Sequence, residues 1–217
     1  GSDVAGARTV AVKDGDEYVI NGSKIFTTNS GFADTFLVFA LTDKAAGPHK
    51  GMSAFLIDRN TPGITVQPDI KRMGIRGASN SEVVYTDVRV PASDLLGGEG
   101  KGFKIAMKAL DGGRIGIAAQ SVGLAQGALD EAIAYCKERK QFGRAIAQFQ
   151  NTQFQLADMQ TKVDAARLLI YRSAMAKQNH EPYSMDAAMA KLVAAETASD
   201  VTRRCVQLFG GYGYTRP

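Results

Sequence analysis

The sequence has no tryptophan and only two histidines and two cysteines among its 217 residues. His49 and His180 stand alone, without a cysteine or carboxylate at ligand spacing, which argues against a metal site and against serine–histidine catalysis. Cys136 and Cys205 lie far apart in stretches that predict helix, so we expect two buried, reduced thiols rather than a disulfide. The chemistry of this protein should therefore not depend on a metal.

Long apolar runs and the common catalytic strings are missing too. No run approaches the roughly 20 apolar residues that a membrane-spanning helix needs. The sequence also lacks GxSxG, HExxH and GxxxxGK[ST], and has no GxGxxG after a parallel strand. We expect no contact with a membrane.

The charge balance indicates an anionic small ligand rather than a nucleic acid. The 26 basic residues are spread among 22 acidic ones, for a formal charge of +4. A nucleic-acid binder usually concentrates its Lys and Arg, so the pI near 9.0 is weak support for that alternative. A small anionic ligand, such as a nucleotide or coenzyme A, fits this charge balance at least as well as a nucleic acid does. Apolar residues make up 45% of the chain, as in an ordinary globular protein.

The first part of the chain has the pattern of short strands. Asp14-Gly15 and Asn21-Gly22 both stand between β-rich runs and predict tight hairpin turns. Further strands are expected at 35–41, 54–57, 64–66 and 82–90. Short strands at this spacing without intervening helices predict an antiparallel sandwich or barrel.

After Pro91 the period becomes helical. We expect a flexible linker over Gly97–Gly102, then helices over 103–110, 114–140, 152–178 and 184–209, with a break at Asp111–Gly113. The stripes expected to be buried in the last two helices are Leu156, Met159, Val163, Ala166 and Ile170, and Ala188, Leu192, Ala195, Ser199, Thr202, Val206 and Phe209. The predicted fold is α+β multidomain: a β domain over 1–95, then an incomplete antiparallel helical bundle over 96–217. A fourth helix or a second subunit should cover its apolar stripe.

Eight strings together resemble one protein family, in the right order and over the whole length. They are Gly1–Gly6, Asn21–Asn29, Lys71–Gly77, Val88–Pro91, Gly100–Phe103, Asp111–Ile115, Glu138–Gly143 and Gln207–Tyr214. Each string is weak evidence alone, but eight in register are not explained by chance. The chain resembles the acyl-CoA dehydrogenases, and within them the short-chain, butyryl-CoA type.

This resemblance implies FAD as the cofactor. It places Phe26 beside the flavin ring, where the family usually has Trp, and the Thr28 hydroxyl near flavin N5. Read alone, these two residues are ordinary positions of a strand. The residues implied to contact the FAD of a neighbouring subunit are Arg139, Gln141, Phe142, Gln150, Gln207, Gly210 and Gly211. Without the resemblance, Arg139 would be interpreted as a solvated cation at a helix end, and the glycine pair as a helix C-cap. The family arrangement implies a homodimer or homotetramer.

The resemblance also implies a substrate and a reaction. Ser2 should lie near the pantetheine, and Asp111 with Arg114 should position the coenzyme A end, although a helix break explains the latter segment as well. The implied reaction is α,β-dehydrogenation of a short-chain acyl-CoA to the trans-2-enoyl-CoA, with electrons passed to an electron-transfer flavoprotein.

The catalytic base is the main departure from the family pattern. The family's Glu is expected beyond Pro217, and Gly113 occupies its alternative position, so we expect residues 1–217 to be inactive alone. A bacterial cytoplasm or the mitochondrial matrix is the implied location. A branched-chain or aryl acyl-CoA dehydrogenase and a non-catalytic interaction module of the same fold remain alternatives.

Overall fold

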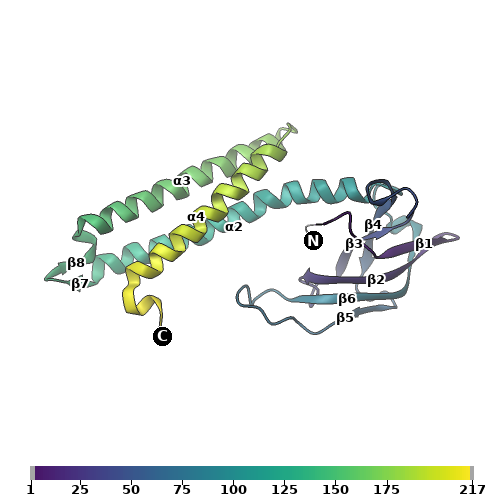
Figure 1. The fold of residues 1–217 in the computed structure, drawn as a ribbon, viewed down its shortest axis with the longest axis horizontal. Helices are drawn as coiled ribbons and strands as arrows, with labels where there is room; N and C mark the ends of the chain where they lie inside the picture. Colours follow the sequence, from purple (N-terminus) through teal and green to yellow (C-terminus); the bar gives the residue numbers. More distant parts are fainter. Residues whose placement is uncertain (1–2, 216–217) are drawn as a thin grey trace. The chain divides into compact units, whose positions relative to one another are not determined.

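The computed structural model describes residues 3–215 and divides the chain into two compact units, with the division after Lys108 (Figure 1). The first unit consists mainly of strands and the second mainly of helices, as the change of period predicts. Each unit is described here by itself. Within the described residues, no helix is both long enough and apolar enough to cross a membrane.

The first unit is built on one six-stranded sheet. Its strands are β1 Val10–Asp14, β2 Glu17–Thr28, β3 Thr35–Leu41, β4 Met52–Asp58, β5 Ile64–Val66 and β6 Asn80–Pro91. They lie in the order β4-β3-β1-β2-β6-β5, and every pairing is antiparallel except the short parallel contact between β1 and β3. A short helix, α1 Pro48–Gly51, precedes β4 and a 3-10 turn, Ala92–Asp94, follows β6. The mainly antiparallel β architecture is confirmed.

The core of this unit comes from alternate residues of the strands. Tyr18 and Ile20 of β2 face Val90 and Val88 of β6 in the register of the two strands, and all four are buried. The Tyr18 ring meets Phe55 of β4 edge-on, with 5.1 Å between ring centroids. Period-two burial of this kind fixes the register, because a slip by one residue would turn every core side chain to solvent.

The two predicted turns have different outcomes. Gly15, with φ +61°, joins β1 to β2 in a hairpin as expected. The turn predicted at Asn21-Gly22 is wrong, because β2 continues through both residues with a bulge between Ile20 and Gly22. Gly22 is needed for close approach instead: a Cβ there would lie 2.9 Å from the Cα of Thr9. Glycine serves both purposes, so the dipeptide alone did not distinguish them.

The segment predicted as a flexible linker is packed onto the sheet. The amide of Gly100 donates to Ser53 Oγ at 3.0 Å, and the Tyr18 hydroxyl donates to the Glu99 carboxylate. A Cβ on Gly102 would lie 2.6 Å from the carbonyl carbon of Ser53. The prediction of flexibility was therefore wrong, because these glycines allow the backbone to lie against β4.

The second unit contains three long helices. They are α2 Gly102–Glu138, which begins in the first unit, α3 Gln150–Gln178 and α4 Ser184–Phe209. A two-strand hairpin, β7 Lys140–Gln141 and β8 Arg144–Ala145, and a 3-10 turn, Ile146–Gln148, connect α2 to α3. A further 3-10 turn, Gly210–Gly213, follows α4. Helices at these positions confirm the predicted helical part of the fold.

The break predicted at Asp111–Gly113 is wrong, because α2 runs through it without interruption. Glycine inside a helix costs up to about 1 kcal/mol relative to alanine. The buried Ala118, Val122 and Ala125 of the same helix offset this cost by packing in the bundle core. Asp111 and Arg114, three residues apart, also form an ion pair across the glycines.

One of the two predicted apolar stripes is confirmed. On α3, Met159, Val163, Ala166 and Ile170 are buried. On α4 the predicted stripe is wrong: Leu192 and Val206 are exposed. The buried residues of α4 are Ala187, Ala190, Ala194, Thr197, Val201 and Cys205. The buried face carries mainly small side chains, which allow a short distance between packed helices, whereas the larger Leu192 lies on the exposed side.

Both cysteines are free and buried, as predicted. Burial raises the pKa of the Cys136 thiol, and it raises that of Cys205 as well. Both thiols therefore remain protonated and unreactive at neutral pH.

Candidate cofactor site

The end of strand β2 carries an exposed aromatic residue in a strained conformation. Phe26 has φ +57°, lies at a bulge between Lys24 and Thr27, and is 64% exposed. A side chain other than glycine held in this region costs about 1–3 kcal/mol. The exposed ring gains little from burial in this unit, so its conformation presents an aromatic surface rather than filling the core.

Thr28 ends β2, where it is exposed and pairs with Asn80 of β6. The amide N–H of Asn80 donates to Asp69 Oδ1 at 2.6 Å, which fixes the start of β6. The buried side-chain oxygen of Asn80 has no hydrogen-bond partner among the described residues. Buried polar atoms normally have a partner, so this end of the sheet fits a bound polar group.

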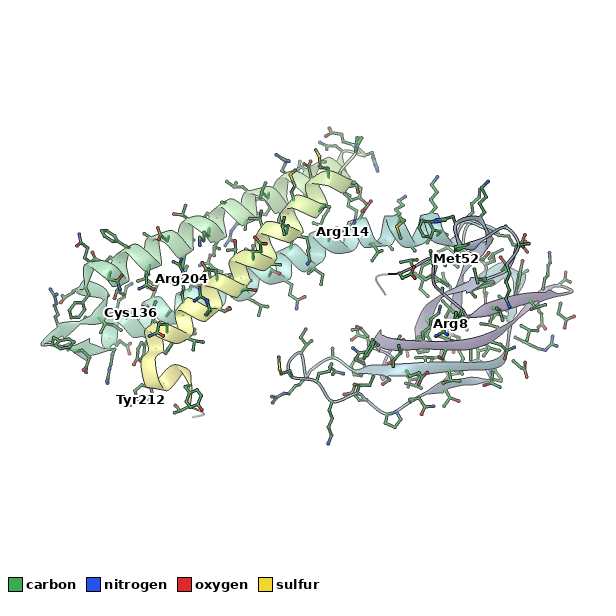
Figure 2. All side chains as sticks on the ribbon, viewed as in Figure 1. Arg8, Met52, Arg114, Cys136, Arg204 and Tyr212 are labelled. Atoms are coloured by element: carbon green, nitrogen blue, oxygen red, sulfur yellow. The ribbon has the colours of Figure 1, made fainter. Side chains whose placement is uncertain are left out.

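The second unit contains a pocket of about 510 Å³ where the end of α2 meets the end of α4. Its lining residues are Tyr135, Arg139, Gln141, Ile146, Leu208, Phe209, Gly210, Gly211, Tyr212 and Thr215. Figure 2 shows Tyr212 at the turn that follows α4. Four of the residues named from two distant strings, Arg139, Gln141, Gly210 and Gly211, thus line one pocket of a size usual for small-molecule sites.

Arg139 is the cation of this pocket. Its backbone is fixed, because its N–H donates to the Tyr135 carbonyl and its own carbonyl accepts from Ile146, both at 2.9 Å. Its guanidinium carbon lies 5.9 Å from the centre of the Tyr212 ring. None of the ion pairs within residues 3–215 involves Arg139. Its charge is available to an anion.

The glycine pair opens the other side of the pocket. Gly210 ends α4 with φ +59°, a conformation that disfavours other residues. A Cβ built on Gly210 or Gly211 would meet nothing within 4 Å, so a ligand can approach the backbone there. A free cation, an accessible backbone and aromatic walls suit the phosphates and adenosine of a dinucleotide. The residues present therefore fit FAD.

The remaining predicted residues do not line this pocket. Phe142 stands at the tip of the β7–β8 hairpin, 93% exposed and with φ +53°, while Gln150 begins α3 and Gln207 lies exposed near the end of α4. Asp111 and Arg114 form their ion pair on α2, where Figure 2 labels Arg114. Ser2 lies outside the described residues. Within residues 3–215, no group of three or more possible metal ligands comes together.

The other lining residues of the pocket were not predicted as site residues, and Tyr135 and Tyr212 are the two tyrosines among them. A signal for each was present. Tyr135 stands four residues before Arg139, which directly follows α2, and Tyr212 directly follows Gly211.

Comparison with known proteins agrees with this geometry. Residues 1–88 match the model of the acyl-CoA dehydrogenase middle domain, and residues 100–217 match that of the C-terminal domain. A short-chain specific acyl-CoA dehydrogenase from Clostridium acetobutylicum is 55% identical over 216 residues, covering 100% of this chain and 57% of its own length. The structure of butyryl-CoA dehydrogenase from Megasphaera elsdenii superposes with a TM-score of 0.97 at 50% identity, covering 100% of this chain and 57% of that chain.

A further similar structure is described as the electron transferring flavoprotein of Acidaminococcus fermentans. It has a TM-score of 0.97 and 52% identity, over 99% of this chain and 56% of that chain. The chain thus spans a little more than half the length of the relatives that it matches. The two domain models together cover most of it in the order of the family. The chain belongs to the acyl-CoA dehydrogenases, a family of FAD-dependent enzymes.

Proposed function

We propose that the protein containing this chain dehydrogenates short-chain acyl-CoA thioesters to trans-2-enoyl-CoA. The supporting observation is the pocket that holds Arg139, Gln141 and the Gly210-Gly211 pair, in a chain 55% identical to a short-chain specific relative. In this reaction a base takes the α proton of the thioester and the β hydrogen leaves as hydride. A bound FAD would supply the acceptor for that hydride and a route for its electrons to a protein acceptor.

The residues of this chain would hold the two ends of the cofactor. Phe26 would shield the flavin ring from water, and the Thr28 hydroxyl would hydrogen-bond near N5. Arg139 and the open backbone at Gly210-Gly211 would hold the phosphates, with Gln141, Phe142, Gln150 and Gln207 contributing around the adenosine. We infer that these two groups of residues come from partner copies, so that a complete site needs at least a homodimer.

On the substrate side, we propose that Asp111 and Arg114 position the coenzyme A end of the thioester. Their ion pair orients the guanidinium, which leaves further donors for the ligand. We further propose that residues 1–217 alone do not catalyse the first step, because we expect the base in the longer protein. The electron acceptor is proposed to be an electron-transfer flavoprotein, since a structure of 52% identity is described under that name.

The test uses the full-length protein that contains this chain. We expect a yellow protein whose flavin absorbance bleaches within a turnover on addition of butyryl-CoA, and more slowly with palmitoyl-CoA, isovaleryl-CoA or an aryl acyl-CoA. Residues 1–217 should show no bleaching with any of them. A full-length protein that binds FAD but bleaches only with a branched or aryl thioester would contradict the substrate class, and a colourless one would contradict the function.

A further inference from the structure

Three aromatic rings form one wall of the pocket that holds Arg139, and we call them the aromatic stack: Tyr135, Phe209 and Tyr212. Tyr135 of α2 stacks on Phe209, the last residue of α4, with 4.6 Å between centroids and 29° between planes. Tyr135 also meets Tyr212 edge-on at 6.4 Å. The stack therefore connects the end of α2 to the turn after α4, two segments more than 70 residues apart in the sequence.

Arg139 extends this series of contacts. It lies one helical turn after Tyr135, and its guanidinium is 5.9 Å from the centre of the Tyr212 ring. Within residues 3–215, no carboxylate competes for that guanidinium. An arginine side chain has many rotamers, and ordering it costs binding free energy unless it is ordered beforehand. A ring beside the guanidinium orders it without neutralising its charge.

We propose that Tyr212 is a positioning residue, which keeps the Arg139 guanidinium at the pocket so that it meets the phosphates of the dinucleotide without reordering. The inference rests on the proposed function, since it assigns this pocket to the phosphate end of FAD. Tyr212 acts through its ring, which Tyr135 supports, and its hydroxyl is not required.

Affinity for FAD measures this role directly. In full-length apoprotein, Tyr212→Leu removes the ring, whereas Tyr212→Phe keeps it. Tyr171→Leu is the matched control, because Tyr171 is a similarly exposed tyrosine of the same unit, on α3, without an aromatic or cationic partner among the described residues. We expect Tyr212→Leu to raise the Kd for FAD about three- to tenfold, the range of an exposed to half-desolvated cation–π contact. The Phe variant and the control should bind as the wild type does.

Two further measurements separate positioning from a general structural role. Riboflavin lacks both phosphates and the adenosine of FAD, so its Kd should not change in Tyr212→Leu. In a double-mutant cycle, Tyr212→Leu combined with Arg139→Gln should bind FAD no more weakly than Arg139→Gln alone, because the ring has no guanidinium left to hold.

The opposite results would overturn the inference. They are an unchanged Kd for FAD in Tyr212→Leu, an equal loss for riboflavin and FAD, or fully additive effects in the cycle. If Arg139→Gln weakens FAD binding and Tyr212→Leu does not, only the positioning role fails. If Arg139→Gln itself leaves the Kd unchanged, the assignment of this pocket to FAD fails.

Discussion

The tip of the β7–β8 hairpin should show a conflict between stability and cofactor binding. Phe142 and Gly143 form its two-residue turn with φ of +53° and +79°. Asn-Gly is the preferred pair for such a turn, because both residues must adopt a positive φ. Phenylalanine at this place is strained by roughly 1 kcal/mol relative to asparagine, an estimate from the cost of the left-handed region for ordinary residues.

Within the unit, contacts of the Phe142 ring offset little of this strain energy. It is 93% exposed, so burial contributes almost nothing. Among residues 3–215, its one aromatic contact is an edge-on approach to Phe149 at 6.2 Å, worth about 0.5 kcal/mol. Phe142→Asn should therefore stabilise the FAD-free protein by about 0.5–1 kcal/mol. In the proposed site the ring contacts the cofactor, so the same change should weaken FAD binding severalfold.

The assay is guanidinium unfolding of full-length apoprotein, together with titration of the apoprotein with FAD. His180→Asn is the matched control, since His180 also has a positive φ of +59° and lies at the end of α3. That variant should become more stable with no change in the Kd for FAD. Lower stability of the Phe142→Asn apoprotein, or an unchanged Kd, would refute the reasoning.

Three other outcomes are expected. His180→Gly should raise the free energy of unfolding by about 1 kcal/mol, because His180 occupies the glycine position of the α3 cap, where the Glu181 N–H donates to the Ala176 carbonyl. Comparing the guanidinium unfolding curves of the variant and the wild type checks this. The free energy of unfolding should fall between pH 10 and 12. Burial, followed by the hydrogen bond and charge of Glu99, raises the pKa of Tyr18 to about 12, and burial raises the pKa of Tyr85 to about 12, so the unfolded chain loses these protons first. The dependence of the urea midpoint on pH should therefore be flatter in Tyr18→Phe and Tyr85→Phe. Asp200→Asn should lower the free energy of unfolding by up to about 1 kcal/mol at neutral pH, because the hydrogen bond from Lys162, followed by that from Arg203 and the charge of Arg204, lowers the pKa of Asp200. This stabilisation is present above pH 3.8 and is lost as the pH falls further. The variant and the wild type should therefore unfold alike near pH 2.

Much of the fold could be predicted because the hydrophobic period changes once, near Pro91. The three long helices and the antiparallel strands follow from that change. The errors lie at glycines and alanines. Asn21-Gly22 and Asp111–Gly113 have the composition of a turn and a break, yet they lie inside a strand and a helix where neighbouring packing decides. Local sequence does not reveal which backbone a glycine will face.

The candidate site was only partly predictable for a related reason. The strings containing Arg139 and Gly210 were named through the family resemblance, since a lone arginine and a glycine pair are equally typical of helix ends. Tyr135 and Tyr212 are marked in the sequence only by their proximity to Arg139 and Gly211, and their contacts depend on the way the ends of α2 and α4 come together. The strain at Phe26 and Phe142 is likewise a property of the backbone rather than of residue type.

Subunit complementation tests the central claim, that Thr28 and Arg139 of partner copies hold one FAD. Full-length Arg139→Gln and the double variant Phe26→Ala, Thr28→Ala should each bind FAD weakly. When both are co-expressed with different tags and the mixed assembly is isolated, each pair of copies has one site carrying both lesions and one intact site. We predict that the mixed assembly recovers tight binding of about half the wild-type FAD. Binding no better than that of either parent variant would contradict the account, because it would mean that each site is built within a single copy.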